Sequence, residues 1–187
     1  MIGKFIQENI TYDGSQLSSL WAFRNFGLQG DSIVSFRGSC EVKIDAMVDL
    51  ADVRDGDSIY SEDMLHFIVE HFDMDLEKAV TRQRLLITII KELLEELTGC
   101  RLKRKGDDLY HGENKLSVSI ATLSPVSSMI HTAINISSNN TPVPTISTSE
   151  LGWPEHRSAE LAEEICQRYV AEINSIFMAR CKVRGVD

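Results

Sequence analysis

The sequence predicts an α+β fold in which a mixed, mainly antiparallel sheet is covered by two long helices. Strand-like segments come in runs that lack the regular strand–helix–strand alternation of a doubly wound parallel sheet. Two segments with helical periodicity, residues 75–98 and 158–180, are long enough to cover such a sheet. With 187 residues, 43% of them hydrophobic, the chain can bury one sizeable core, so we expect a single domain over residues 1–187.

Composition and charge limit the classes of partner. The chain has 28 acidic and 19 basic residues, a formal net charge of −9, which disfavours broad nucleic-acid binding. No basic and then apolar signal region follows Met1, and no apolar run approaches the roughly 20 residues that span a bilayer. We therefore expect a cytoplasmic protein without a membrane partner. Four widely spaced cysteines without a CxxC pair predict reduced structural thiols, not a zinc site or a disulfide framework.

Short apolar segments predict four strands in the first 72 residues. They are residues 4–12, 32–36, 40–48 and 64–72. A short helix before the second strand ends at Gly27. Between the second and third strands, Arg37-Gly38-Ser39 forms a loop in which glycine lets the backbone bend or approach a ligand closely. This loop is either a ligand-binding element or an ordinary bulge with a surface arginine.

The segment from Asp45 to Asp63 contains several irregularly spaced aspartates. A calcium-binding EF-hand needs oxygen ligands at alternate positions, then a glycine and a terminal glutamate, and this segment lacks that spacing. We predict solvated turns here, with Asp55-Gly56 as a hairpin turn. A magnesium ion that bridges a nucleotide could still recruit one of these carboxylates.

His66, Glu70 and His71 form an H-x-x-x-E-H pattern that invites comparison with a metal site. The segment is short, aromatic and β-branched, which favours a strand over the helix that zinc-protease motifs require. On a strand, His66 and Glu70 share one face and His71 points away. Structural or interface histidines are therefore favoured over metal ligands. As an apolar edge strand, residues 64–72 could pair across a two-fold axis, which predicts a homodimer.

Two long helices bracket the second half of the chain. Asp75 can cap the first, which Gly99 ends. The basic strip 101–105 that follows predicts a solvated edge strand, or alternatively a surface that meets a phosphate or an acidic carrier domain. Residues 139–153, rich in Ser, Thr and Pro, predict a long loop that can cover a site before the second helix begins.

Residues 107–137 contain the candidate site. A strand at 107–110 leads into a turn at His111–Asn114, and a strict alternation from 115 to 122 follows, which predicts a β-hairpin. A third strand after Ser124-Pro125 repeats the alternation. If these strands pair, polar side chains from both would share one surface opposite the apolar core. They are Lys115, Ser117, Ser119, His131 and Asn135.

This stretch resembles the catalytic hairpin of the biotin and lipoate protein ligases. In that family an Asp-hydrophobic-Tyr strand turns through a glycine, reaches a Lys-hydrophobic-small pattern, and is followed by a strand that opens with His and ends near Asn. The matching residues here are Asp108-Leu109-Tyr110, Gly112, Lys115-Leu116-Ser117 and the strand from His131 to Asn135. The whole chain resembles a domain-of-unknown-function family assigned to this fold, which is related to class II aminoacyl-tRNA synthetases.

The resemblance implies that Lys115 is the catalytic residue and contacts the acid's carboxylate and the adenylate phosphate. Arg37-Gly38-Ser39 is similar to the family segment that covers the acid and the phosphate. The implied substrate- or nucleotide-binding residues are Arg37, Gly38, Ser39, Asp108, Ser117, Ser119, His131 and Asn135. ATP with Mg²⁺ is the implied cofactor, and no metal site built by the protein alone is predicted. The family carries a glycine shortly after its lysine, where this sequence has Val118.

Two functions of different class remain open. The first is a ligase or acyltransferase that activates a small carboxylic acid with ATP, or transfers an acyl group, with Lys115 stabilising the developing charge. The second is a non-catalytic homo-oligomer that binds a small acid or a nucleotide. Val118 and the short glycine loop at Gly38 favour the second, because both depart from the pattern that adenylate formation requires in the ligases.

Overall fold

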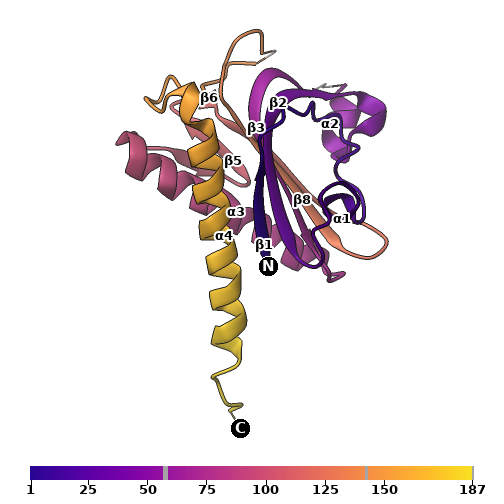
Figure 1. Cartoon of the computed structure of the whole chain (residues 1–187). Helices are drawn as coiled ribbons and strands as arrows, with labels where there is room; N and C mark the ends of the chain where they lie inside the picture. The colour runs from indigo at the N-terminus through magenta and orange to yellow at the C-terminus, as the bar shows by residue number, and fades with distance from the viewer. Residues whose placement is uncertain (57–58, 142, 187) are drawn as a thin grey trace.

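The computed structural model describes residues 1–56, 59–141 and 143–186, and its main sheet has five strands in the order β1-β2-β3-β8-β7 (Figure 1). The strands are β1 (Ile2–Ile6), β2 (Ser32–Val42), β3 (Ile59–His71), β7 (Ser117–Leu123) and β8 (Ser128–Asn135). Among the pairs in this sheet only β1 and β2 run parallel, so the sheet is mixed and mainly antiparallel. The predicted fold class is confirmed.

Two long helices cover one face of this sheet. They are α3 (Leu76–Thr98) and α4 (Ser158–Arg180), which follows a short 3₁₀ turn, η2 (Glu155–Arg157). The Asp75 side chain accepts a hydrogen bond from the Lys78 N–H and Gly99 ends α3 with a φ of 71°, as the sequence predicted. No helix in the described part of the chain is long and apolar enough to cross a membrane.

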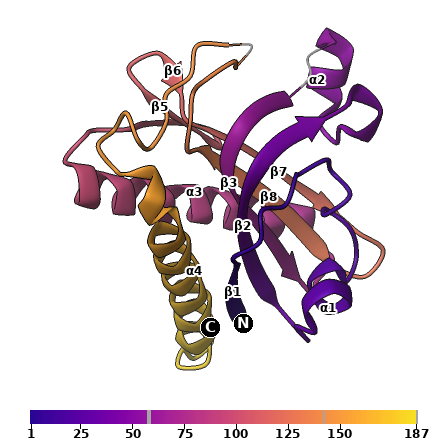
Figure 2. The ribbon, with the colours of Figure 1, turned by 45° about the horizontal axis from the view of Figure 1, so that its top comes forward.

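The opposite face carries shorter elements (Figure 2). They are α1 (Trp21–Phe26), the 3₁₀ turn η1 (Ile44–Ala46) and α2 (Leu50–Asp55). The Asp49 side chain accepts a hydrogen bond from the Ala51 N–H and begins α2, and Gly56 ends it with a φ of 76°. The prediction of a hairpin turn at Asp55-Gly56 is therefore wrong, because the capping aspartate makes this segment helical. Asp57 lies outside the described residues.

Three predicted strands have different bounds in the structure. The first ends at Ile6, and Tyr12 returns only as an isolated bridge to Cys40. The second and third form one strand, β2, whose register shifts between Gly38 and Cys40. This shift is the β-bulge that the sequence offered as one alternative for the loop.

β3 is the central strand and not an edge strand. It pairs with β2 on one side and with β8 on the other, and all residues from Met64 to His71 are buried. The prediction that 64–72 forms an exposed edge is wrong, because both of its backbone edges are already paired within the chain. A homodimer remains a prediction, but not one formed through this strand.

The predicted hairpin is divided between two sheets. A smaller three-stranded sheet contains β4 (Lys103–Lys105), β5 (Asp108–His111) and β6 (Asn114–Lys115). β5 and β6 pair around a turn in which Gly112 has a φ of 61°. Leu116 then separates β6 from β7, which belongs to the main sheet. The strict alternation that was predicted from 115 to 122 is therefore interrupted at its second residue.

Candidate functional site

The main sheet has two distinct faces, which we call the helix face and the open face. The helix face is covered by α3 and α4, and the open face carries α1 and α2. β8 sends Ile130 and Ile134 to the helix face, while Met129 and Ala133 join the apolar cluster of the open face. His131 follows the same alternation and lies on the open face, as predicted.

Two of the predicted site residues alternate toward the helix face, because Ser117 and Ser119 pair with Ile134 and Thr132 of β8. Ser119 pairs with Thr132, and its hydroxyl contacts Thr132 Oγ1 at 2.9 Å and receives a hydrogen bond from Gln83 of α3. The Ser117 hydroxyl accepts a hydrogen bond from the Leu109 N–H at 2.8 Å. The break at Leu116 resets the alternation, so both hydroxyls bond to groups away from the open face. Ser119 nevertheless lines a pocket with Lys115 and His131, and Ser117 lines one with Lys115 and Asn135.

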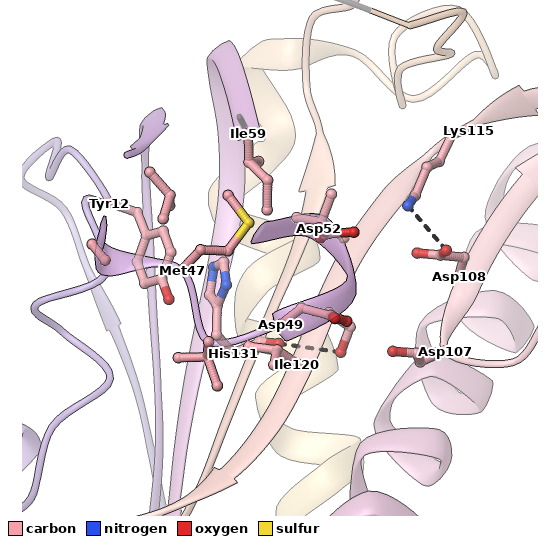
Figure 3. A pocket seen from close by; sticks show the side chains of 15 residues that line it. Tyr12, Met47, Asp49, Asp52, Ile59, Asp107, Asp108, Lys115, Ile120 and His131 are labelled. Atoms are coloured by element: carbon pink, nitrogen blue, oxygen red, sulfur yellow. Dashed lines mark hydrogen bonds and ion pairs between the residues drawn. The ribbon is translucent and has the colours of Figure 1, made fainter. Parts of the chain in front are cut away.

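The open face contains a pocket of about 220 Å³, which we call the aspartate pocket (Figure 3). Its polar lining is dominated by carboxylates from α2 and from the start of β5. They belong to Asp49, Asp52, Asp107 and Asp108. Lys115 Nζ lies 2.9 Å from Asp108 Oδ2. Burial raises the pKa of the Asp108 carboxyl, although Lys115 opposes the rise.

A second pocket of about 370 Å³ adjoins the first, and we call it the asparagine pocket. Asn135 lines it and donates hydrogen bonds to the carbonyls of Lys115 and Ile146. Thr141 and Thr145 of the predicted covering loop contribute to its wall. The two pockets share Lys115, Val118, Ile59 and Asp52. Lys115 therefore stands at their junction.

The inner end of the aspartate pocket is a column of aromatic rings. Tyr12 stacks on His131 with ring centroids 3.6 Å apart, and His66 stacks against Phe36 at 5.1 Å. His66 Nδ1 lies 3.1 Å from His131 Nε2, and His66 Nε2 lies 3.2 Å from the Gly38 carbonyl oxygen. Desolvation lowers the pKa of His66 to about 4 and also lowers that of His131. Both rings are therefore neutral at physiological pH.

Arg37 lies on the helix face, away from the aspartate pocket. Its guanidinium binds the Asp63 carboxylate through Nε and Nη2 and donates to the Glu155 carbonyl and to the Ser158 hydroxyl at the start of α4. Arg37, Gly38 and Ser39 line a separate opening that shares no described residue with the pockets at Lys115. The prediction that Arg37 lies near Lys115 is wrong.

Gly38 has a structural reason to be glycine. A Cβ built on Gly38 would lie 2.1 Å from the Ile10 carbonyl oxygen. The close approach that the sequence indicated is therefore to the backbone of residues 9–12, not to a ligand. Ser39 holds the same segment, since its hydroxyl lies 3.0 Å from that of Thr11.

The H-x-x-x-E-H residues divide as the alternation predicted. His66 and Glu70 face the open side, and Glu70 accepts hydrogen bonds from the Leu20 N–H and the Ser127 hydroxyl. His71 faces the helices and contacts Asp31 and the Tyr169 hydroxyl. Each of the three is held by protein groups. Among the described residues no group of three or more His, Cys, Asp or Glu is arranged to hold a metal ion.

Sequence reasoning missed several pocket residues. Tyr12 was assigned to a strand, and Asp49 and Asp52 were assigned to solvated turns. Asp49 followed by an apolar residue is an N-cap signal that would have indicated α2. His66 and His131 are 65 residues apart, and no local pattern connects them.

The amino-acid sequence matches the family model of a domain of unknown function, DUF366, over residues 1–184. The uncharacterized protein MJ0805 of Methanocaldococcus jannaschii is 43% identical over 178 residues, which are 92% of this chain and 79% of that protein. A solved protein of unknown function from Pyrococcus horikoshi is 41% identical, with a TM-score of 0.92 over 100% of both chains.

Solved ligases share the fold at much lower identity. Biotin protein ligase from Aquifex aeolicus, solved in complex with biotin and ATP, is 15% identical, with a TM-score of 0.62 over 90% of this chain and 71% of that chain. Ta0514, a putative lipoate protein ligase from T. acidophilum, is 13% identical, with a TM-score of 0.61 over 92% and 85%. These similarities confirm the predicted biotin/lipoate ligase-like fold, and the family match shows that the chain belongs to the DUF366 family.

Proposed function

We propose that the protein binds a small carboxylic acid in the aspartate pocket and activates it with ATP, with Lys115 contacting both reactants. The observation that carries this proposal is the position of Lys115 at the junction of the two pockets. Among the described residues that line them, Lys115 is the only lysine or arginine. A positioned cation stabilises the negative charge that develops when a carboxylate oxygen attacks a phosphate. The products would be an acyl adenylate and pyrophosphate.

The aspartate pocket has an apolar wall that suits the hydrocarbon part of such an acid. Ile59, Val118 and Ile120 belong to this wall. Its volume of about 220 Å³ lies below the range of roughly 300 to 1,000 Å³ for pockets that take drug-sized ligands. The proposed substrate is therefore small.

The lining of the asparagine pocket contains groups that suit a nucleotide. The Ser61 hydroxyl is buried in its wall without a hydrogen-bond partner in the described part of the chain, which is unusual unless a ligand or water satisfies it. Tyr60 is 42% exposed and offers a ring on which a base can stack. Magnesium usually takes one or two carboxylates together with substrate phosphates, and Asp52 lines both pockets. ATP would supply the adenylyl group, and these residues would hold it.

The fold supports the same proposal by analogy alone. The Aquifex aeolicus structure that shares it is a biotin protein ligase in complex with biotin and ATP. Because one fold carries many functions, the pockets at Lys115 support the proposal more strongly than this likeness does.

Pyrophosphate exchange tests the proposal directly. The protein is incubated with ATP, Mg²⁺, labelled pyrophosphate and one acid at a time from a panel of small carboxylic acids. Label that enters ATP only when a particular acid is present supports acid activation. If every acid gives the rate measured without acid, the proposed activity is wrong.

Lys115→Ala supplies the residue-specific test. We expect the exchange rate at low substrate to fall by about a hundredfold to a thousandfold, because removing one positioned charge-stabilising group costs about 2 to 4 kcal/mol. Lys103→Ala is the matched control, since Lys103 is an exposed lysine on β4 that lines neither pocket. Equal losses in both variants would show that Lys115 has no special role.

Binding without chemistry is the second candidate function, and Arg37 favours it. The arginine that the resemblance implied for the phosphate is held on the helix face by Asp63 and Glu155. Under this alternative, calorimetry detects binding of an acid or of ATP while no acid promotes exchange. Lys115→Ala would then weaken binding without any activity to lose.

A further inference from the structure

The polar atoms at the inner end of the aspartate pocket have a fixed direction of hydrogen bonding. The Gly38 carbonyl can only accept, so His66 Nε2 must carry the proton that joins them. A neutral His66 then presents a lone pair at Nδ1, which accepts from His131 Nε2. A neutral His131 in turn has no proton on Nδ1. The carbonyl of a bulge on β2 therefore determines the tautomer of a histidine on β8.

His131 Nδ1 and the Tyr12 hydroxyl take no part in the two hydrogen bonds of this relay. Both side chains line the aspartate pocket, and each is only 4% exposed. A ligand that fills this end of the pocket contacts both side chains, and its polar groups can hydrogen-bond to them. The two rings stack face to face, with centroids 3.6 Å apart.

The inner end of the aspartate pocket mainly offers hydrogen-bond acceptors. His131 Nδ1 only accepts in the tautomer that the relay fixes, whereas the Tyr12 hydroxyl can donate or accept. The carboxylates of Asp49 and Asp107 elsewhere on the pocket also only accept when ionised. A ligand carbonyl or ether facing His131 would place two lone pairs against each other.

From this arrangement we propose that Tyr12 and His131 select a substrate whose end away from the carboxylate carries an N–H or O–H donor. This inference depends on the proposed function, because Lys115 would hold the carboxylate at the opposite end of the pocket (Figure 3). His131 Nδ1 accepts a hydrogen bond from this donor, and where the donor is a hydroxyl the Tyr12 O–H can donate to its oxygen. His66 is a positioning residue that keeps Nδ1 of His131 free.

Matched acids test the selection. Plain alkanoic acids, ω-oxo acids and ω-hydroxy acids of a series of chain lengths are titrated by calorimetry and supplied in the exchange assay. At the best length we expect the hydroxy acid to bind about tenfold or more tightly than the plain acid, because a site built to hydrogen-bond a hydroxyl rejects its apolar analogue. The oxo acid should bind more weakly than the hydroxy acid.

The outcomes separate this inference from the proposed function. Exchange that is equal for hydroxy and plain acids overturns the donor selection while acid activation stands. Preferential binding of hydroxy acids without exchange supports the selection and overturns activation. Failure of every acid to bind overturns both.

Tyr12→Phe is the first variant, because it removes only the hydroxyl and keeps the stacked ring. We expect the preference for the hydroxy acid to shrink several-fold while the affinity for the plain acid is unchanged. Tyr169→Phe is the matched control, since Tyr169 is a buried tyrosine whose hydroxyl contacts His71 on the helix face. A preference that survives Tyr12→Phe, or that is lost equally in the control, contradicts the proposal.

The tautomers themselves can be read without any ligand or variant. Long-range ¹H–¹⁵N spectra of ¹⁵N-labelled protein distinguish a protonated from an unprotonated ring nitrogen. At neutral pH we expect His66 and His131 to carry their protons on Nε2. A proton on Nδ1 of His131 would overturn the inference, since that atom would then donate to the pocket and favour an acceptor.

Discussion

The two faces of the main sheet bury their strands in different ways. On the helix face, α3 and α4 pack apolar side chains against residues such as Phe67 and Ile134, and they form a large apolar core. On the open face, short elements cover only part of the sheet and leave pockets lined by carboxylates, histidines and a lysine. The alternation of one strand, β8, supplies both faces. Stability should therefore depend mostly on the first face and ligand chemistry on the second.

The largest expected effect is a cavity on the helix face. Phe67→Ala removes a fully buried ring from the core beneath the helices, which should lower the free energy of unfolding by about 3 to 5 kcal/mol. Phe72→Ala is the matched control, because Phe72 is 42% exposed just beyond the end of β3. Urea unfolding measures both. A loss of similar size in the control would contradict the conclusion that stability depends mostly on the helix face.

A pH titration should show that the buried histidines of the open face destabilise the folded protein at low pH. The pKa of His66 is about 4 in the folded protein and about 6.5 in the unfolded chain, so the unfolded state takes up the proton first. The stability that the neutral ring provides is present above pH 6.5 and is lost as the pH falls toward 4, by about 3 kcal/mol for this shift. His131, whose pKa is also lowered, acts in the same direction.

The experiment is urea unfolding between neutral pH and about pH 4. The free energy of unfolding should depend less steeply on pH in His66→Gln, because glutamine cannot titrate but can still donate a hydrogen bond to the Gly38 carbonyl. His156→Asn, at an exposed position of η2, should leave this slope unchanged. An unaltered slope in His66→Gln would mean that other groups cause the pH dependence.

Gly38→Ala should destabilise the open face by displacing the neighbouring backbone. The added methyl group would overlap the Ile10 carbonyl, so the segment 9–12 must shift, at a cost of about 1 to 3 kcal/mol. That segment carries Tyr12, and its movement should also weaken ligand binding in the aspartate pocket. Gly185→Ala is the control, because a Cβ there meets no atom within 4 Å and Gly185 does not have a positive φ. Full stability of Gly38→Ala would contradict the close packing.

The sequence predicted those features that depend on local periodicity. The cap and the glycine stop of α3 and the alternation of β8 residues between the two faces of the sheet follow from local signals, and the structure has them. The break at Leu116 was not predictable from alternation, because a bulge or a change of sheet preserves composition while it shifts the period. That single residue turned the Ser117 and Ser119 hydroxyls toward the helix face, although both residues still line the pockets at Lys115.

Pairings between distant segments explain the remaining errors. β3 was assigned to an edge because its histidines and glutamate suggested partial exposure, yet Glu70 is buried by contacts with Leu20 and Ser127, 50 and 57 residues away in the sequence. Arg37 was placed at the site by resemblance, and its face depends on a register with Leu65 that no local pattern encodes. Polar residues buried by long-range partners cannot be recognised one segment at a time.

The smallest expected effect on stability is at the proposed catalytic residue. The Lys115 and Asp108 side chains are 32% and 24% exposed, so their ion pair should contribute no more than about 1 kcal/mol to the free energy of unfolding. Lys115→Ala creates no core cavity, but it leaves a carboxylate in a partly buried site without its cation. The pKa of Asp108, already raised by burial, should rise further, because Lys115 opposes that rise.

The sign of this effect can be checked. A carboxyl whose folded pKa lies above its unfolded value destabilises the protein as the pH rises through that pKa, so the cost of Lys115→Ala should appear at neutral pH and vanish in acid. Asp108→Asn removes the unpaired charge, and in the double variant with Lys115→Ala the stability at neutral pH should recover to that of Asp108→Asn alone. Denaturant titrations of the four proteins at both pH values complete the cycle. If Lys115→Ala is destabilised by several kcal/mol at both, Lys115 belongs to the structural core of the open face, and a loss of ligand binding in that variant could not be assigned to chemistry.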